Sequence, residues 1–211
     1  KDTLSLHDAL PICHGRVHHN YVHDNFTHEW FGGGKIGIYI DTRLDVRDVE
    51  VDHNVVERAG TGIRLCNETS PPGSAVRIHH NLVKDNRHLG IDIRGKGIFG
   101  EGLVHDIEVT HNTAYRNGVL ASYGASGTGC GISIRGGRGM KDILVRNNIS
   151  AFNQGWAYAF HRGTHRNEQK ITVDYNLTWP AIFDATTREG TSDHPIIGDL
   201  PIFADPGFID P

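Results

Sequence analysis

The chain has 211 residues, enough for one sizeable domain or one stretch of repeats. Its 26 glycines and single methionine favour tight turns over helices, and no apolar run reaches the roughly 18 residues that a membrane helix needs. The formal net charge of -4 gives no reason to expect a nucleic-acid partner. The three cysteines form neither a zinc motif nor a disulfide framework. We therefore predict no membrane and no nucleic-acid partner.

The first 12 residues differ from everything that follows them. They fit no part of the repeat described below, and residues 5–12 (SLHDALPI) resemble translated sequencing adapter, which is found at the ends of genes assembled from environmental DNA. Such a segment is left out of reasoning about the fold, as a tag would be. We predict that residues 1–12 are an artefactual extension and that the natural N-terminal part is missing.

From there on, a run of alternating apolar residues leads into an asparagine six times. Successive asparagines are separated by 34, 27, 31, 36 and 28 residues. A period of this size, with one strand pattern per copy, is typical of a stacked solenoid. Since asparagine tolerates left-handed backbone and bonds neighbouring main chain, we interpret the column as a structural ladder at one corner. Its members are Asn20, Asn54, Asn81, Asn112, Asn148 and Asn176.

Each repeat also holds a second strand pattern, which starts with a glycine and alternates with period two. Clear copies begin at Gly37, Gly62, Gly90 and Gly131, and a weaker one begins at Gly155. Two or three short strands per repeat close into one rung of a parallel β-helix, about 4.8 Å from the next rung. The alternation predicts that apolar side chains of both patterns fill one core. They are Ile38, Ile40, Ile63, Leu65, Ile91, Ile93, Ile132 and Ile134, and on the other strand Val49, Val51, Val76, Ile78, Ile107, Val109, Ile143, Val145, Ile171 and Val173.

The succession of I-x-V-x-x-N-x-V and G-I-x-I through residues 15–178 resembles the right-handed parallel β-helix repeat. Pectate lyases, polygalacturonases, alginate lyases, epimerases and several glycoside hydrolases share that repeat. The final IFADPGFIDP resembles the D-P-x-F-x-D-P segment that often follows the last coil in such proteins. The resemblance implies an all-β, right-handed parallel β-helix of about six coils over residues 13–180, a tail over residues 181–211, and truncation at both ends. It also implies a secreted or cell-surface protein with a polysaccharide partner, although no signal peptide is visible.

Outward positions of the G-I-x-I strands are expected to form two adjacent columns on one face. Carboxylates and guanidinium groups would meet there, which suits an anionic or hydroxyl-rich polysaccharide. Charged residues also keep an exposed β-helix face soluble and pair across strands, so any single residue has a structural explanation as well. The first column contains Tyr39, Arg64, Asp92, Ser133 and Tyr158, and the second contains Asp41, Cys66, Arg94, Arg135 and Phe160, with Lys96 and His161 just beyond.

Two long insertions are expected to border this face. Residues 25–34 and 118–129 both lie between the asparagine corner and a G-I-x-I strand. Insertions in solenoids commonly build the binding side. Trp30, in the first insertion, would serve as a platform on which a sugar stacks.

We expect a carbohydrate-active enzyme that cleaves glycosidic bonds of a polysaccharide, with a slight preference for a glycoside hydrolase. Asp41 and Asp92 would be its carboxylate pair, two rungs and about 10 Å apart. A lyase or epimerase acting on uronates through Arg, Lys or His is the alternative. A non-catalytic adhesin or polysaccharide-binding module would explain the fold equally well. The predicted catalytic residues are Asp41, Asp92, Arg94 and His161, and the predicted substrate-binding residues are Trp30, Tyr39, Arg64, Lys96, Arg135 and Tyr158.

Histidines gather beside the ladder asparagines. His18, Asp52 and His79 share one repeat position, and four further histidines share the next. Imidazole and carboxylate can bind a transition metal, but a column spaces ligands along a line, whereas zinc prefers a tetrahedral cage. Calcium needs a dense oxygen cluster, and no Asp-rich loop is present. We therefore predict no metal and no other cofactor. The four further histidines are His19, His53, His80 and His111.

Overall fold

The computed structural model describes residues 4–5, 14–25, 35–42, 46–67, 73–97, 100–101, 104–119, 129–135, 140–160, 170–179 and 202–203. Within these residues the chain consists of strands and the turns between them, and none of it is helical. Accordingly, this part of the chain contains no helix long and apolar enough to cross a membrane. The predicted all-β class is confirmed.

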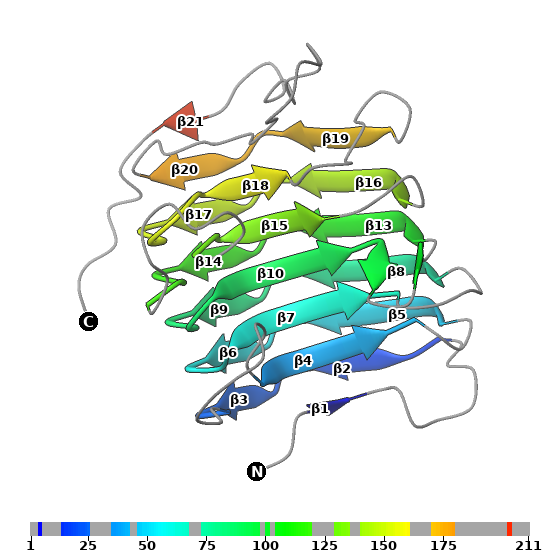
Figure 1. Cartoon of the computed structure of the whole chain (residues 1–211), viewed down its shortest axis with the longest axis horizontal. Coiled ribbons are helices and arrows are strands. Elements are labelled where there is room, and N and C mark those ends of the chain that lie inside the picture. Colours follow the sequence, from blue (N-terminus) through cyan, green and yellow to red (C-terminus); the bar gives the residue numbers. More distant parts are fainter. Residues whose placement is uncertain are drawn as a thin grey trace.

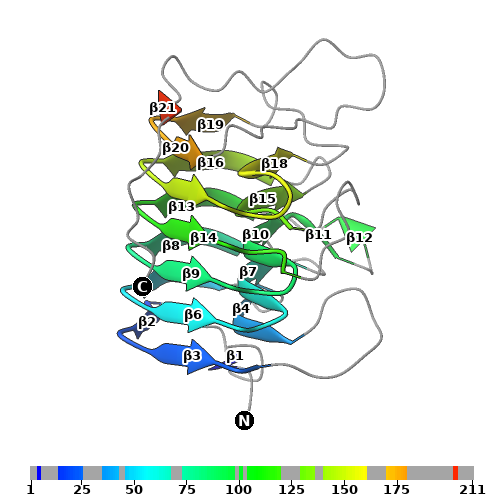
Figure 2. The same ribbon diagram turned by 90° about the vertical axis from the view of Figure 1, so that its left-hand side faces the viewer.

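Three parallel sheets run along the solenoid, and each full rung gives one strand to each sheet (Figure 1, Figure 2). Sheet A contains β1 (Leu4–Ser5), β4 (Ile36–Asp41), β7 (Thr61–Cys66), β10 (Leu89–Arg94), β15 (Ile132–Arg135) and β18 (Tyr158–Phe160). Sheet B contains β2 (Arg16–His18), β5 (Arg47–Asp52), β8 (Gly73–His79), β13 (Val104–Thr110), β16 (Met140–Arg146) and β19 (Ile171–Asp174). Sheet C contains β3 (Tyr21–His23), β6 (Val55–Glu57), β9 (Leu82–Lys84), β14 (Thr113–Tyr115), β17 (Ile149–Ala151), β20 (Leu177–Trp179) and β21 (Ile202–Phe203).

The chain visits the sheets in the order B, C, A in each rung, so the predicted parallel β-helix is confirmed. A small antiparallel pair, β11 (Lys96–Gly97) and β12 (Gly100–Glu101), stands out beyond the end of β10 (Figure 2). Residues 1–12, which were set aside as an extension, contribute β1, and the predicted tail contributes β21. The interpretation of both segments stays a prediction.

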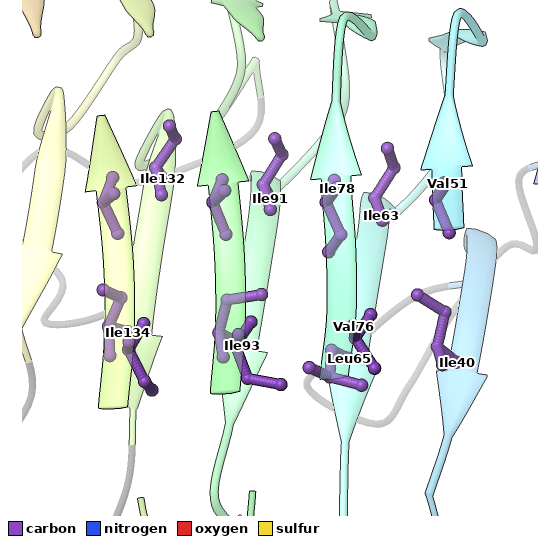
Figure 3. Close-up of a cluster of buried hydrophobic side chains, with 14 of the residues drawn as sticks. Ile40, Val51, Ile63, Leu65, Val76, Ile78, Ile91, Ile93, Ile132 and Ile134 are labelled. Atoms are coloured by element: carbon purple, nitrogen blue, oxygen red, sulfur yellow. The ribbon is translucent and has the colours of Figure 1, made fainter. Parts of the chain in front are cut away.

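The core lies between the three sheets, where the alternation of the strands places it. Every apolar side chain predicted to point inward is buried, and all of them belong to one continuous cluster. Figure 3 shows how side chains of successive sheet A strands, such as Ile63, Ile91 and Ile132, form a row from strand to strand and lie against those of sheet B. Like residues stack because the parallel register pairs Ile63 with Ile91 and Ile91 with Ile132.

The asparagine ladder at the corner between sheets B and C is confirmed. From Asn54 onward, each side-chain oxygen accepts from the backbone N–H of the preceding ladder asparagine at 2.9–3.0 Å. Each amide in the middle of the ladder also donates to a main-chain carbonyl of the preceding rung, as Asn112 does to Ile78 at 2.8 Å. The left-handed backbone falls on the residue before each asparagine, for example His80 with φ 54°, rather than on the asparagine itself.

A second ladder, which the sequence analysis missed, lies at the corner between sheets C and A. Asn117 Oδ1 accepts from the backbone N–H of Asn86, and Asn153 Oδ1 accepts from that of Asn117, at 3.3 and 2.9 Å. These asparagines are buried and come five residues after a member of the first ladder. Ala59 holds the same place in its rung, and its N–H donates to Asn86 Oδ1 at 2.9 Å. That constant offset of five was the available signal.

The glycines that begin the G-I-x-I strands are required by close packing between rungs. A Cβ added to Gly37, Gly62 or Gly90 would lie 2.8, 2.7 or 2.4 Å from the carbonyl oxygen of the corresponding glycine of the next rung. At such distances the contacting atom has to move away from the new Cβ. A flexible side chain could do so, but a backbone carbonyl inside the sheet cannot. A glycine therefore recurs there because the two chains touch main chain to main chain.

A Gly90→Ala variant is expected to lose about 2–3 kcal/mol of folding free energy, since the new methyl group has to displace backbone in two rungs. Its Cβ would meet Gly131 O at 2.4 Å and Asn117 Nδ2 at 2.8 Å. The check is the midpoint of urea unfolding. A midpoint equal to that of the parent protein would contradict the contact.

Candidate functional site

The outward face of sheet A carries the two columns that the strand pattern predicts, up to β15. The register aligns Tyr39, Arg64, Asp92 and Ser133 in the first column. It aligns Asp41, Cys66, Arg94 and Arg135 in the second. Asp41 and Asp92 therefore lie two rungs apart in neighbouring columns, as expected.

The last rung departs from the prediction, and Tyr158 does not face outward. Tyr158 pairs with Ile132 and is 1% exposed within the core cluster, while Ala159 takes the outward position beside Ser133. Gly155 is not the counterpart of Gly131, because its N–H donates to Gly129 O and the strand begins later. The assignment of Tyr158 to the outward column is wrong by one residue, and the backbone of Phe160 pairs with that of Ile134. Because Tyr158 does not face outward, the reason for proposing it as a substrate-binding residue no longer holds.

Three guanidinium groups surround the carboxylate of Asp92. Arg64 Nε donates to Oδ2 at 2.8 Å, Arg94 Nε lies 3.2 Å from Oδ2, and Arg135 Nε lies 3.0 Å from Oδ1. The arginines come from three successive strands, β7, β10 and β15, because the register stacks their rungs. Arg64 also donates to Thr61 Oγ1, and Arg135 donates to Ser133 Oγ. We call Arg64, Asp92, Arg94 and Arg135 the arginine cluster.

The arginine cluster carries two more positive charges than negative ones. Asp92 is fully buried, but the side chains of Arg94 and Arg135 remain 29% and 22% exposed. Burial raises the pKa of the Asp92 carboxyl, yet the charges of Arg64, Arg135 and Arg94 outweigh it and hold that pKa below its usual value. Burial lowers the pKa of Arg135, and the other two arginines lower it further. The positive excess therefore faces the surface through Arg94 and Arg135.

The predicted carboxylate pair is closed from solvent. Asp41 is 2% exposed and Asp92 is 0% exposed. A general acid needs a raised pKa so that it holds a proton at neutral pH, and the three guanidinium groups hold Asp92 in the opposite state. The Asp41–Asp92 mechanism stays a prediction, and the surroundings of Asp92 argue against its role as the acid.

The remaining predicted residues are only partly within the described part of the chain. Tyr39 is half-buried in the first column. Lys96 belongs to β11 and is described by its backbone alone. Trp30 and His161 lie outside the described residues, as do most of the two insertions. The expected open strip is thus wrong for its central positions, since Arg64, Cys66 and Ser133 are buried.

Two residues beside the arginine cluster were missed by sequence reasoning. His88 immediately precedes β10. Its pKa is lowered, mainly by burial and further by the positive charges of Arg87, Arg64 and Arg135. Trp156 is half-buried and packs against a small apolar cluster formed by Leu89, Cys130 and Ala159. Neither occupies a G-I-x-I column, so the strand pattern gave no signal for them.

The histidines form a second concentration of polar side chains, on sheet B and its corner. The imidazole rings of His19, His53, His80 and His111 stack with centroids 5.0–5.1 Å apart and planes within 5° of parallel. His18, Asp52 and His79 share the neighbouring register position on β2, β5 and β8. Both predicted columns are confirmed.

Comparison with known proteins agrees with this geometry. Neither a curated protein nor a solved structure matches the chain. A family pattern described as a right-handed β-helix region matches residues 5–150. Because that match covers well over half of the 211 residues, and because the strands form stacked parallel sheets, the protein belongs to the right-handed β-helix family.

Proposed function

We propose that the protein binds an acidic polysaccharide along the outward face of sheet A and cleaves it by β-elimination at a uronate residue. The observation that supports this is the composition of the arginine cluster, in which three guanidinium groups share one carboxylate. A neutral sugar brings no negative charge to this cluster. A uronate brings a second carboxylate, for which guanidinium forks have matching geometry.

Arg94 and Arg135 are the residues proposed to bind the sugar carboxylate. Each contacts Asp92 through Nε, and each side chain is partly exposed, so a ligand on this face can reach both guanidinium groups. Asp92 holds the two side chains in place from beneath, and a positioned donor loses less entropy on binding than a free one. Neutralising the sugar carboxylate makes the neighbouring C–H bond more acidic, which is the first requirement of elimination.

His88 is the base that we assign to the reaction. Its lowered pKa keeps the imidazole neutral at pH 7, and it lies near enough to Arg64 and Arg135 to be affected by their charges. The imidazole would take the proton beside the carboxylate, the released electron pair would form the sugar double bond, and the glycosidic oxygen would leave and take a proton from solvent. Hydrolysis through Asp41 and Asp92 is less favoured, because Asp92 is buried and ionised.

The test follows two products of cleavage on a panel of neutral and uronic-acid polysaccharides. Elimination releases reducing ends together with the near-ultraviolet absorbance of unsaturated uronates, so both signals should rise on uronic-acid substrates only. Reducing ends without absorbance would indicate hydrolysis and overturn the proposal. Binding without either product would indicate a polysaccharide-binding module.

Arg135→Gln should weaken binding of a uronic-acid polysaccharide by about 10- to 100-fold, since a charged hydrogen bond to the ligand is lost. The matched control is Arg146→Gln on sheet B, where Arg146 likewise pairs with an aspartate one rung away, Asp174. Calorimetric titration checks both. Equal affinity in the two variants would exclude Arg135 from the site.

A His88→Asn variant tests the proposed base. It should lower kcat while leaving KM unchanged, because the imidazole is proposed to remove a proton rather than to hold the substrate.

A further inference from the structure

Two strands of sheet B bring two carboxylates and an imidazole together, away from the arginine cluster. Glu50 and Asp52 lie on the same face of β5, and His79 of β8 is paired in register with Asp52. One ligand atom from each of the three residues lies within 4.8 Å of the others. His79 Nε2 lies only 2.7 Å from Glu50 Oε1.

The group is partly enclosed by the surrounding side chains. The Asp52 side chain is fully buried, whereas those of His79 and Glu50 are 18% and 28% exposed. A buried carboxylate is desolvated and gains strongly from a nearby cation. The partial exposure of the other two residues leaves a route from solvent to the same point.

Neighbouring groups orient these side chains as outer-shell residues orient metal ligands. Arg16 holds Asp52 with two hydrogen bonds, Nε to Oδ1 at 2.7 Å and Nη2 to Oδ2 at 2.6 Å. His80 Nδ1 lies 2.8 Å from His79 Nδ1, so the His79 ring is fixed with its Nε2 directed at Glu50. Metal-binding histidines almost always have their second ring nitrogen engaged in this way.

The charges of the group also favour a dication. Two carboxylates face one guanidinium, Arg16, and the imidazoles of His53 and His79 contact those carboxylates. With neutral imidazoles, Glu50, Asp52 and Arg16 together carry one excess negative charge, and Arg77, in register with Glu50 on β8, is exposed to solvent. We propose that Glu50, Asp52 and His79 bind a divalent transition metal ion that accepts mixed nitrogen and oxygen ligands, as Zn²⁺ does.

Glu50 removes the objection that a column of ligands lies along a line. His18, Asp52 and His79 stack along the solenoid axis, but Glu50 comes from the neighbouring column and turns the line into a triangle. The metal would take the place of the proton that His79 Nε2 shares with Glu50 Oε1. His79 would then carry its proton on Nδ1 and donate it to His80 Nδ1.

In the experiment, the protein is first dialysed against a chelator, and Zn²⁺ is then titrated into it while calorimetry measures binding. Glu50→Gln and His79→Gln should each weaken binding by at least about 10-fold. The matched control is His105→Gln, because His105 Nδ1 contacts Asp106 Oδ2 at the same 2.7 Å on this sheet, and no third ligand joins them among the described residues. Circular dichroism without metal confirms that each variant is folded.

Three results would overturn the proposal. The first is a parent protein that takes up no Zn²⁺ at stoichiometric amounts, and the second is binding by Glu50→Gln and His79→Gln that equals that of the parent. The third is an equal loss in His111→Gln, which would place the ion on the stacked imidazoles, because His111 belongs to that stack and not to the triangle. Binding of Zn²⁺ is measured independently of any polysaccharide, so the outcome does not depend on the function proposed for sheet A.

Discussion

An Asn112→Ala variant is expected to unfold far more readily than the parent protein. The amide of Asn112 accepts from the backbone and side-chain nitrogens of Asn81, both at 3.0 Å. It also donates to Ile78 O at 2.8 Å and to Thr110 O at 3.0 Å. Alanine takes this partner from the backbone N–H of Asn81 and from the carbonyl of Ile78 inside the buried stack, at about 1–3 kcal/mol for each group that water does not reach. We expect a total loss of about 3–6 kcal/mol, which is a large share of the stability of an ordinary domain.

The measurement is chemical unfolding of Asn112→Ala beside Asn20→Ala. Asn20 stands at the first position of the same ladder and is half-buried. Its side chain donates to the exposed His18 O and to Asn54 Oδ1, and Asn54 Oδ1 keeps the Asn20 backbone N–H as a donor in the variant. The two variants remove the same side chain, and their difference isolates the effect of a position inside the stack. If both variants lost the same free energy, the ladder would contribute through local turn geometry rather than through buried hydrogen bonds.

Asp92→Asn is expected to be comparably damaging, for an electrostatic reason. The substitution keeps the shape of the side chain but removes the negative charge that Arg64, Arg94 and Arg135 share. Removing one partner of a buried ionic group costs about 3–5 kcal/mol. The control is Asp174→Asn, whose partner Arg146 is largely exposed on sheet B and should change stability little.

The melting temperature in the presence of sulfate is a second measurement on the Asp92→Asn variant. Three uncompensated guanidinium groups form an anion site, so added sulfate should raise the melting temperature of Asp92→Asn more than that of the parent protein. An identical shift in both proteins would show that the arginines separate once Asp92 is neutral. Because the variant is expected to be unstable, loss of cleavage activity in Asp92→Asn would not identify Asp92 as catalytic.

The fold was predictable because each rung repeats the same local requirements. Alternation placed Ile63 and Ile91 in the core, and stacking of like residues placed Arg64 beside Asp92. The second ladder was also within reach, since Asn86 and Asn117 each follow a first-ladder asparagine by five residues. These features depend on neighbours in adjacent rungs, and the period of the sequence reveals those neighbours.

The candidate site was harder to predict because its chemistry depends on burial. The strand pattern assigns Asp92 to the outward face but does not tell how little of it meets solvent. The alternating pattern of the last sheet A strand is weak, because its alanines and aromatic residues fit either face. The predicted register was therefore wrong by one residue at Tyr158. His88 belongs neither to a strand pattern nor to an asparagine ladder, so its position becomes known only from the folded chain.

The first asparagine ladder has a consequence for engineering. Its members are 27 to 36 residues apart along the chain, yet each contact from backbone N–H to side-chain oxygen measures 2.9–3.0 Å. Variation in length is therefore absorbed between the strands, while the rungs keep a fixed pitch. The connection that leads into each sheet A strand could therefore serve as an insertion site for segments of different lengths. Segments grafted there would be displayed at regular intervals along one edge, with the spacing set by the coil itself.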